Sequence, residues 1–281
     1  MKNMINCRPS PLVGRWYPAH PKELADSVDS YIQAAQIPEI QGKILALVSP
    51  HAGHIYSGPV AGYAFRSISN LNPELVVILS PLHQYHPDAI LTSGHQAYET
   101  PLGEISIDRE SVELVNRSLH EKTGFELSEI RNDSEHAIEI ILPFLQRALQ
   151  SEFRLLPLML RRQDPQLMRA LGEILSGLIS SHSTLLVAST DLSHFQTAEE
   201  AQKLDQTIID GIQALDPEQL YRAHQKKTGS ACGLGALAAV IWAVKAGGSA
   251  EVQILNYAHS GDITGDNSSV VGYTSAVITR K

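Results

Sequence analysis

The chain has 281 residues, of which 43% are hydrophobic and 19% are charged, and its formal net charge is −8. This length suits one large α/β domain with a sizeable core. Basic residues form no cluster longer than the pairs Arg161-Arg162 and Lys226-Lys227, so no nucleic-acid-binding surface is expected.

The start of the chain and its cysteines suggest where the protein works. The sequence MKNMINCRPSPL has no apolar segment before Pro9, so no secretory signal is expected. The longest apolar run, 234–244, is too short to cross a bilayer, and no membrane association is expected. Only Cys7 and Cys232 are present, which excludes a disulfide framework and favours a cytoplasmic protein.

Apolar runs alternate with helical patterns along the chain, and no repeat or linker divides it. Predicted strands occupy residues 44–49, 75–80, 153–159, 185–189, 251–257 and 270–279, and residues 88–107 read as a short β-meander. Predicted helices lie near 59–69, 109–119, 135–149, 166–180, 198–214, 217–226 and 234–247. Continuous apolar strands are typical of a sheet covered on both faces. We therefore predict a single α/β domain over residues 1–281, a layered sandwich with helices flanking a mainly parallel mixed sheet.

Polar residues follow three of the predicted strands directly. A capping box at Thr197 and Glu200 marks the start of a helix, so residues 191–196 are predicted to form a loop. In open α/β sheets, ligands bind beyond the carboxyl ends of the strands. A single histidine there is usually a solvated loop residue, but three strand ends together favour an assembled site. The residues concerned are His51, His83, Asp191 and His194.

Cys232 stands among small residues just before a strongly apolar helix. The helix dipole at that position favours the thiolate, although a buried and inert cysteine is an equally ordinary interpretation. With His51 and His83, this thiol would form a three-ligand set that leaves a coordination position open. Such a set fits zinc, copper or iron(II). His194 could then act as an acid or base, with Asp191 orienting it or supporting a ligand.

A cysteine nucleophile activated by His194 is the rival interpretation of the same residues. It leaves His51 and His83 without a role, whereas a metal ion uses both of them. We therefore prefer the metal site.

The chain resembles the Memo family from Arg8 to nearly its C-terminus. The motifs that carry the resemblance are RPSPLVGRWYP (8–18), SPHAGHIYSGPVAGYAF (49–65), SPLHQ (80–84), YETPLGEISID (98–108), SEHAIEIILPFLQ (134–146), STDLSHF (189–195), ACGLGAL (231–237) and LNYAHSGDITGDNSSVVGY (255–273). Each motif is weak by itself, but their order and spacing are specific. The resemblance implies a fold similar to that of the LigB-type, class III extradiol dioxygenases, with a metal pocket at the strand ends.

The resemblance also implies roles for individual residues. The metal ligands would be His51, His83 and Cys232, with Asp191 and His194 as further pocket residues that act in catalysis. Trp16 matches a position on the pocket wall, although it could simply pack at the edge of the hydrophobic core. His136 matches a histidine near the pocket, although it could cap its helix. His54 stands where the family usually has tyrosine. It is predicted to be an exposed neighbour of the site and not a ligand.

The function implied by the resemblance is a non-haem oxidoreductase, dioxygenase-like, that uses iron(II) or copper on a small-molecule or peptide substrate. A zinc-dependent hydrolase and a non-catalytic module that binds a peptide or a phosphorylated ligand are the alternatives. LigB-type enzymes complete their iron site with a carboxylate, so the cysteine in this pattern argues against inferring ring cleavage from the fold. Bacterial relatives imply radical-SAM and AMMECR-type proteins of the same pathway as partners.

Overall fold

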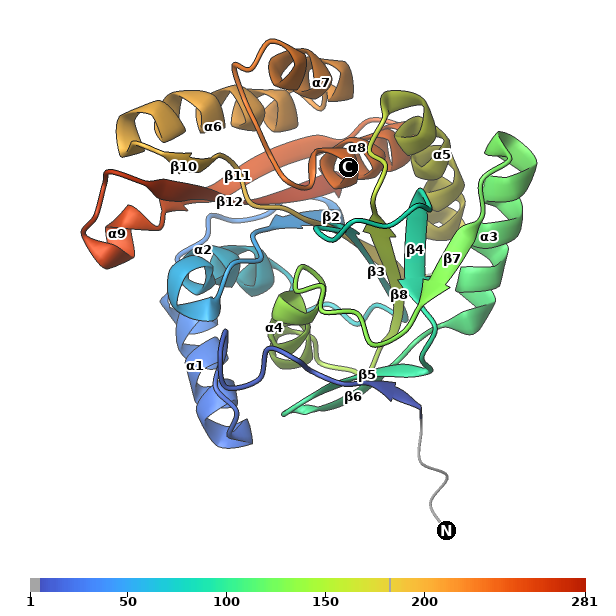
Figure 1. Cartoon of the computed structure of the whole chain (residues 1–281), viewed down its shortest axis with the longest axis horizontal. Helices are drawn as coiled ribbons and strands as arrows, with labels where there is room; N and C mark the ends of the chain where they lie inside the picture. Colours follow the sequence, from blue (N-terminus) through green and yellow to red (C-terminus); the bar gives the residue numbers. More distant parts are fainter. Residues whose placement is uncertain (1–5, 182) are drawn as a thin grey trace.

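A mixed sheet runs through the centre of the protein in the computed structural model, which describes residues 6–181 and 183–281 (Figure 1). Residues 1–5, which belong to the stretch where no secretory signal is predicted, lie outside the described residues. Four neighbouring strands, in the order β2-β9-β3-β8, are parallel to one another. Their bounds are Lys43–Ser49 for β2, Thr184–Ser189 for β9, Leu75–Pro81 for β3 and Arg154–Leu160 for β8.

Antiparallel strands extend this parallel centre at both edges. β12 (Val270–Arg280) pairs antiparallel with β2, with β10 (His194–Gln196) and with β11 (Glu251–His259). At the far edge, β4 (Ile90–Ser93) is antiparallel to β8, and β7 (Leu127–Ile130) is parallel to β4. Every residue of β3 is buried, as the continuous apolar sequence predicts. The predicted mixed sheet with a mainly parallel centre is confirmed.

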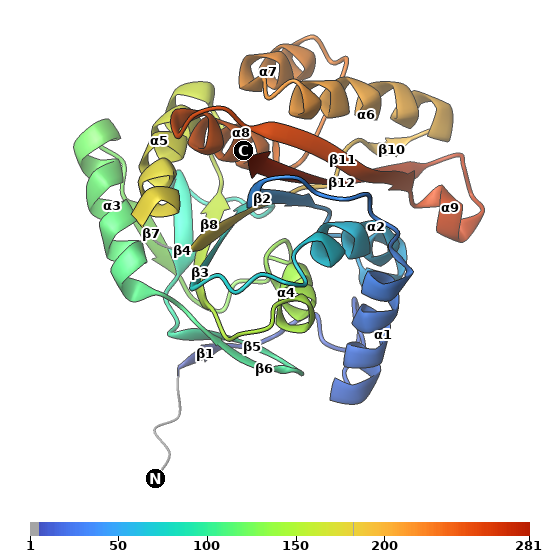
Figure 2. The same ribbon diagram turned by 180° about the vertical axis from the view of Figure 1, so that it is seen from behind.

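Helices cover the sheet on both sides (Figures 1 and 2). On one side, α1 (Pro21–Ala34), α2 (His54–Ser67) and α4 (Leu142–Ala148) pack together. On the other side lie α3 (Arg109–Thr123), α5 (Pro165–Ser181) and α8 (Leu234–Ala246), with α6 (Ala198–Gln213) and α7 (Pro217–Gln225) beside them. The structure also contains two short helices, η1 (Glu139–Ile141) and α9 (Gly261–Thr264). No helix among the described residues is long and apolar enough to cross a membrane.

Three helix predictions need correction, and the first is that α2 begins at His54 and not near residue 59. The helix α1 was not predicted, although its buried residues Leu24, Val28 and Ile32 recur at helical spacing behind an initial proline. The helix predicted over 135–149 begins only at 139, as η1 followed by α4. Glu135 explains the later start. Its side chain accepts the backbone N–H groups of residues 136 and 137, and these local hydrogen bonds replace the first turn of the predicted helix.

Two loop regions also differ from the prediction. The meander predicted over 88–107 divides between two sheets, because β4 joins the large sheet. The strands β5 (Ala97–Thr100) and β6 (Gly103–Ser106) form a hairpin, and β1 (Cys7–Arg8) adds to β5 in parallel. The loop predicted over 191–196 ends in the short strand β10, which pairs with β12.

Candidate metal centre

The site lies where the parallel strands β2, β9 and β3 end at one edge of the sheet. His51, Asp191 and His83 each follow the last residue of one of these strands by two positions. Because parallel neighbours present their carboxyl ends together, residues far apart in the sequence meet here.

Three histidines form the candidate metal site. His51, His83 and His136 each offer one ring nitrogen, and these three nitrogens lie within 4.8 Å of one another. The ring centroids are 5.5 Å apart for His51 and His83, 5.2 Å for His51 and His136, and 4.5 Å for His83 and His136. We call these residues the histidine trio. The structure thus brings the predicted ligands His51 and His83 together with His136, which had been placed only near the pocket.

Hydrogen bonds determine which nitrogen of His51 is free. The Ser189 hydroxyl donates its proton to the carbonyl of Ala137 at 2.6 Å, so it must accept from Nδ1–H of His51 at 2.7 Å. Nε2 of His51 therefore keeps its lone pair. Burial lowers the pKa of His51 well below its ordinary value, and the neighbouring imidazoles lower it further. His51 is thus neutral and fit to bind a cation.

Glu135 orients His83 in a similar way. Its carboxylate accepts the backbone N–H of His83 at 2.6 Å and the Nδ1–H at 2.9 Å, which leaves Nε2 of His83 for a ligand bond. Burial opposes ionisation of Glu135, but the hydrogen bonds and charge of His83 lower its pKa to about 2. Burial also opposes a charged His83, yet Glu135 and Asp191 raise its pKa. A charged His83 carries a proton on Nε2 as well as on Nδ1. A cation that binds Nε2 would displace this second proton.

His136 completes the trio and connects it to the pocket wall. Burial lowers its pKa to about 4, so its ring is neutral at pH 7. Its ring lies 4.7 Å from Trp16, measured between centroids, and stacks on His83 at an angle of 22°. Three neutral or readily deprotonated imidazoles suit iron(II), copper or zinc, so the side chains present fit a divalent metal ion.

The predicted ligand Cys232 lies beside the trio. Its Sγ is 3.2 Å from Nε2 of His51 and accepts the backbone N–H of Asp191 at 3.2 Å. Burial, with a contribution from Asp191, raises the pKa of the thiol to about 12, so the thiolate expected from the helix dipole does not form by itself. A bound cation would be needed to remove its proton. Cys232 therefore stays a predicted ligand next to the trio.

Asp191 and His194 occupy the positions expected of groups that support the site. Oδ1 of Asp191 accepts the backbone N–H of His51 at 2.8 Å, and burial raises the pKa of Asp191 to about 7. His194 donates Nδ1–H to the carbonyl of Leu192 at 2.9 Å, which leaves its Nε2 as an acceptor. In this structure Asp191 therefore supports the ligand segment, and a backbone carbonyl orients His194.

His54 is buried, and the prediction of an exposed loop histidine is wrong. It is the first residue of α2 and is 1% exposed. Its Nε2–H donates to the carbonyl of Ile140 at 2.9 Å, and its ring packs 5.3 Å from Tyr17 and 4.9 Å from Phe144. Burial lowers its pKa to about 4. His54 thus contributes to the packing around the site, as a neighbour and not as part of the trio.

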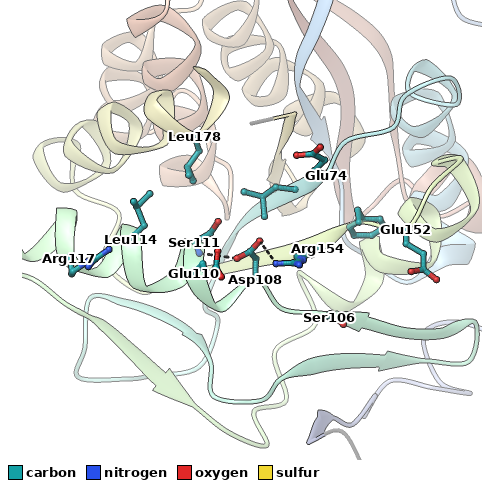
Figure 3. A pocket seen from close by; sticks show the side chains of 12 residues that line it. Glu74, Ser106, Asp108, Glu110, Ser111, Leu114, Arg117, Glu152, Arg154 and Leu178 are labelled. Carbon is teal, nitrogen blue, oxygen red and sulfur yellow. Dashed lines mark hydrogen bonds and ion pairs between the residues drawn. The ribbon is translucent and has the colours of Figure 1, made fainter. Parts of the chain in front are cut away.

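A cavity of about 880 Å³ opens onto two members of the trio, His83 and His136. It is lined by His83, Asp191 and His194 and by the three residues predicted for the pocket, Trp16, His54 and His136. A second hollow, of about 770 Å³, lies at the opposite ends of β3 and β8, where Asp108 and Arg154 form an ion pair at 3.6 Å (Figure 3). The second hollow is remote from the imidazoles, so the first cavity is the candidate functional site.

Glu135 and Ser189 were missed as site residues. Each had a signal in the sequence, because Glu135 directly precedes His136 and Ser189 is the last residue of a strand that leads to Asp191. That signal becomes meaningful only when the three-dimensional neighbours are known.

Comparisons with known proteins show the family to which the chain belongs. The model of the family described as "Memo-like protein" matches residues 8–277. A MEMO1 family protein of Nitrosopumilus maritimus is 36% identical over 93% of this chain and 96% of its own length. Another, of Methanopyrus kandleri, is 36% identical over 96% of this chain and 99% of its own.

A solved structure shows the fold alone. An uncharacterized protein of Escherichia coli K12 aligns with a TM-score of 0.55 and 13% identity, over 85% of this chain and 100% of its own. With the family match spanning nearly the whole chain and relatives above 30% identity, the protein belongs to the Memo family.

Proposed function

We propose that the protein is a metal-dependent oxidoreductase that holds iron or copper on the histidine trio and acts on a ligand bound in the adjoining cavity. The convergence of three imidazole nitrogens within 4.8 Å at the edge of a cavity carries this proposal. Three protein ligands leave room for a substrate at the metal, as in catalytic and not in structural centres. Cys232, next to His51, is the alternative third ligand.

The residues around the trio have separate roles in binding and in proton transfer. When bound, iron or copper would supply one-electron chemistry for the molecule that is bound in the cavity. Ser189 and Glu135 hold His51 and His83 with their Nε2 atoms available. His194, on the cavity wall, can accept a proton from the ligand at its free Nε2. Asp191 fixes the backbone of His51.

A zinc-dependent hydrolase is the second candidate. The observation that favours it is the composition of the trio, because three histidines with an open position are a common catalytic zinc site. In that case His194 would take the proton of a water molecule that zinc activates. The same cavity and the same ligands serve both proposals, so the metal distinguishes them.

The test is metal analysis of protein purified without oxygen or chelators, followed by measurement of O2 uptake after loading with iron(II) or copper. The oxidoreductase predicts bound iron or copper and O2 uptake, whereas retained zinc without O2 uptake supports the hydrolase. His51→Ala should lose the metal, and the exposed His224→Ala on α7 is the matched control. Metal content equal to the parent's in His51→Ala would overturn both proposals.

Two further variants identify the third ligand. Loss of metal in His136→Ala with retention in Cys232→Ser supports the histidine trio. The reverse result assigns the third position to Cys232.

A further inference from the structure

A β-bulge places two adjacent side chains on the wall of the same cavity. In the pairing of β10 with β12, His194 lies opposite Val271 and Gln196 lies opposite Val270, so Phe195 is an extra residue. Neighbouring residues of a regular strand point to opposite faces. Here both His194 and Phe195 line the cavity, and their rings are 5.7 Å apart. The bulge thus directs Phe195 toward the site.

The backbone of Phe195 is held in a costly conformation. Its φ is 60°, in the left-handed region that bulky side chains avoid. Ser193, two residues before Phe195, is anchored on two sides, since its N–H donates to Asp205 at 2.8 Å and its carbonyl accepts the N–H of Gly272 at 3.0 Å. Strained residues of this kind persist where the surroundings impose them, and they gather at ligand-binding sites.

The ring of Phe195 is exposed at the cavity mouth. It is 76% exposed, and two further apolar residues of the wall, Ile55 and Tyr56 on α2, are 61% and 38% exposed. Exposed apolar groups gathered at one place mark a binding surface. A cavity of about 880 Å³ lies in the size range of sites for small molecules, and its wall carries two members of the trio, His83 and His136. A small ligand fits these facts better than a protein surface.

We propose that Phe195 is a specificity-determining residue, which packs against an apolar group of a small ligand whose polar end binds at the histidine trio. This inference rests on the proposed metal centre for the polar end of the ligand. The contact with Phe195 concerns only the apolar end. The two parts can therefore be tested separately.

The first test uses two probes that share one metal-binding group. Acetohydroxamate carries a methyl group where benzohydroxamate carries a phenyl group. Calorimetry on the zinc-loaded protein gives a Kd for each. We expect benzohydroxamate to bind about tenfold tighter to the parent. Phe195→Ala should reduce this ratio at least threefold and leave the Kd of acetohydroxamate unchanged.

Leu114→Ala is the control, because Leu114 is 41% exposed and lines the hollow at the other end of the sheet (Figure 3). It should keep the parent's ratio. An equal ratio in the parent and in Phe195→Ala would overturn the proposal. The metal centre would stand in that case, since acetohydroxamate still binds.

The second test needs no metal. Saturation-transfer NMR on the metal-free protein should detect benzyl alcohol, with a signal that falls in Phe195→Ala and not in Leu114→Ala. If zinc does not bind but this difference is observed, the zinc-dependent alternative fails and the role of Phe195 stands. If neither probe distinguishes Phe195→Ala from the parent, the role of Phe195 fails.

Discussion

Glu135 shows how one buried carboxylate organises a site. It accepts hydrogen bonds from the ring and backbone of His83 and from the backbone N–H groups of His136 and Ala137. A single side chain therefore sets the ring orientation of one trio member and the backbone of another. Carboxylates that hold a histidine ligand in this way raise its basicity and its affinity for metals.

We expect Glu135→Gln to weaken metal binding by about 10- to 100-fold, because the neutral amide stabilises the bound His83 less. Competition of the protein with a chromophoric chelator for zinc measures this change. Glu126→Gln is the control, since Glu126 pairs with His120 at 3.3 Å on the exposed surface. Unchanged affinity in Glu135→Gln would contradict a role for this carboxylate in the site.

Asp205 is a second buried carboxylate, behind His194. It is fully buried in α6 and accepts Ser193 N–H and the hydroxyl of Tyr257. Burial raises its pKa above the ordinary value of 3.8, although these two donors act in the opposite direction. Because the unfolded chain ionises Asp205 more readily, its contribution to stability is present below pH 3.8 and is lost as the pH rises through the folded-state pKa.

Asp205→Asn, which does not titrate, should therefore gain stability relative to the parent as the pH rises from 4 to 7. Urea unfolding followed by circular dichroism at several pH values measures this difference. The variant Asp210→Asn, at an exposed position of the same helix, is the matched control. A constant difference for Asp205→Asn would show that burial does not control this carboxyl group.

At the scale of elements, α1 packs closely against α2, the helix that begins at His54. Gly62 of α2 lies so near α1 that an added Cβ would overlap the carbonyl of Tyr31. By contrast, Gly177 in α5 faces open space. The two helical glycines therefore serve different purposes.

We expect Gly62→Ala to destabilise the protein by about 1–3 kcal/mol, because the two helices must move apart. Gly177→Ala should stabilise it by about 0.5–1 kcal/mol, because alanine loses less backbone entropy in a helix. Chemical denaturation of both variants tests the pair. Equal effects would mean that the α1–α2 contact adapts without cost.

At the scale of the whole molecule, a buried ionic network joins the N-terminal segment to the site. Arg8 is 1% exposed and bonds to Asp133 at 2.8 Å, to Glu139 at 2.8 Å and to the backbone carbonyl of Glu135 at 2.7 Å. Glu139 in turn accepts the hydroxyl of Tyr17 at 2.7 Å. The segment that carries Trp16 and the segment that carries His136 are thus held together.

Arg8→Met should destabilise the protein by about 3–5 kcal/mol, since two buried carboxylates would lose their counter-charge. Thermal or chemical unfolding gives the value. Lys22→Met removes an exposed ion pair and should change stability little. A small effect of Arg8→Met would indicate that water replaces the guanidinium.

The sequence by itself determined the features that local patterns encode. Continuous apolar runs predict the parallel strands, and the residues just beyond them, His51, His83 and Asp191, could be selected because parallel strand ends share one edge. The capping box predicts the start of α6, where Thr197 accepts the N–H of Glu200. These inferences need only neighbours in sequence and one rule of topology.

Only the tertiary structure decided the rest. The place of His136 in the trio, the burial of His54 and the hydrogen bonds of Glu135 all depend on contacts between segments far apart in the chain. The pKa of Cys232 followed burial and not the helix dipole, because the loss of water around a charge outweighs a partial charge at a helix end. Burial and long-range contacts leave little trace in a local pattern, and they set the chemistry of this site.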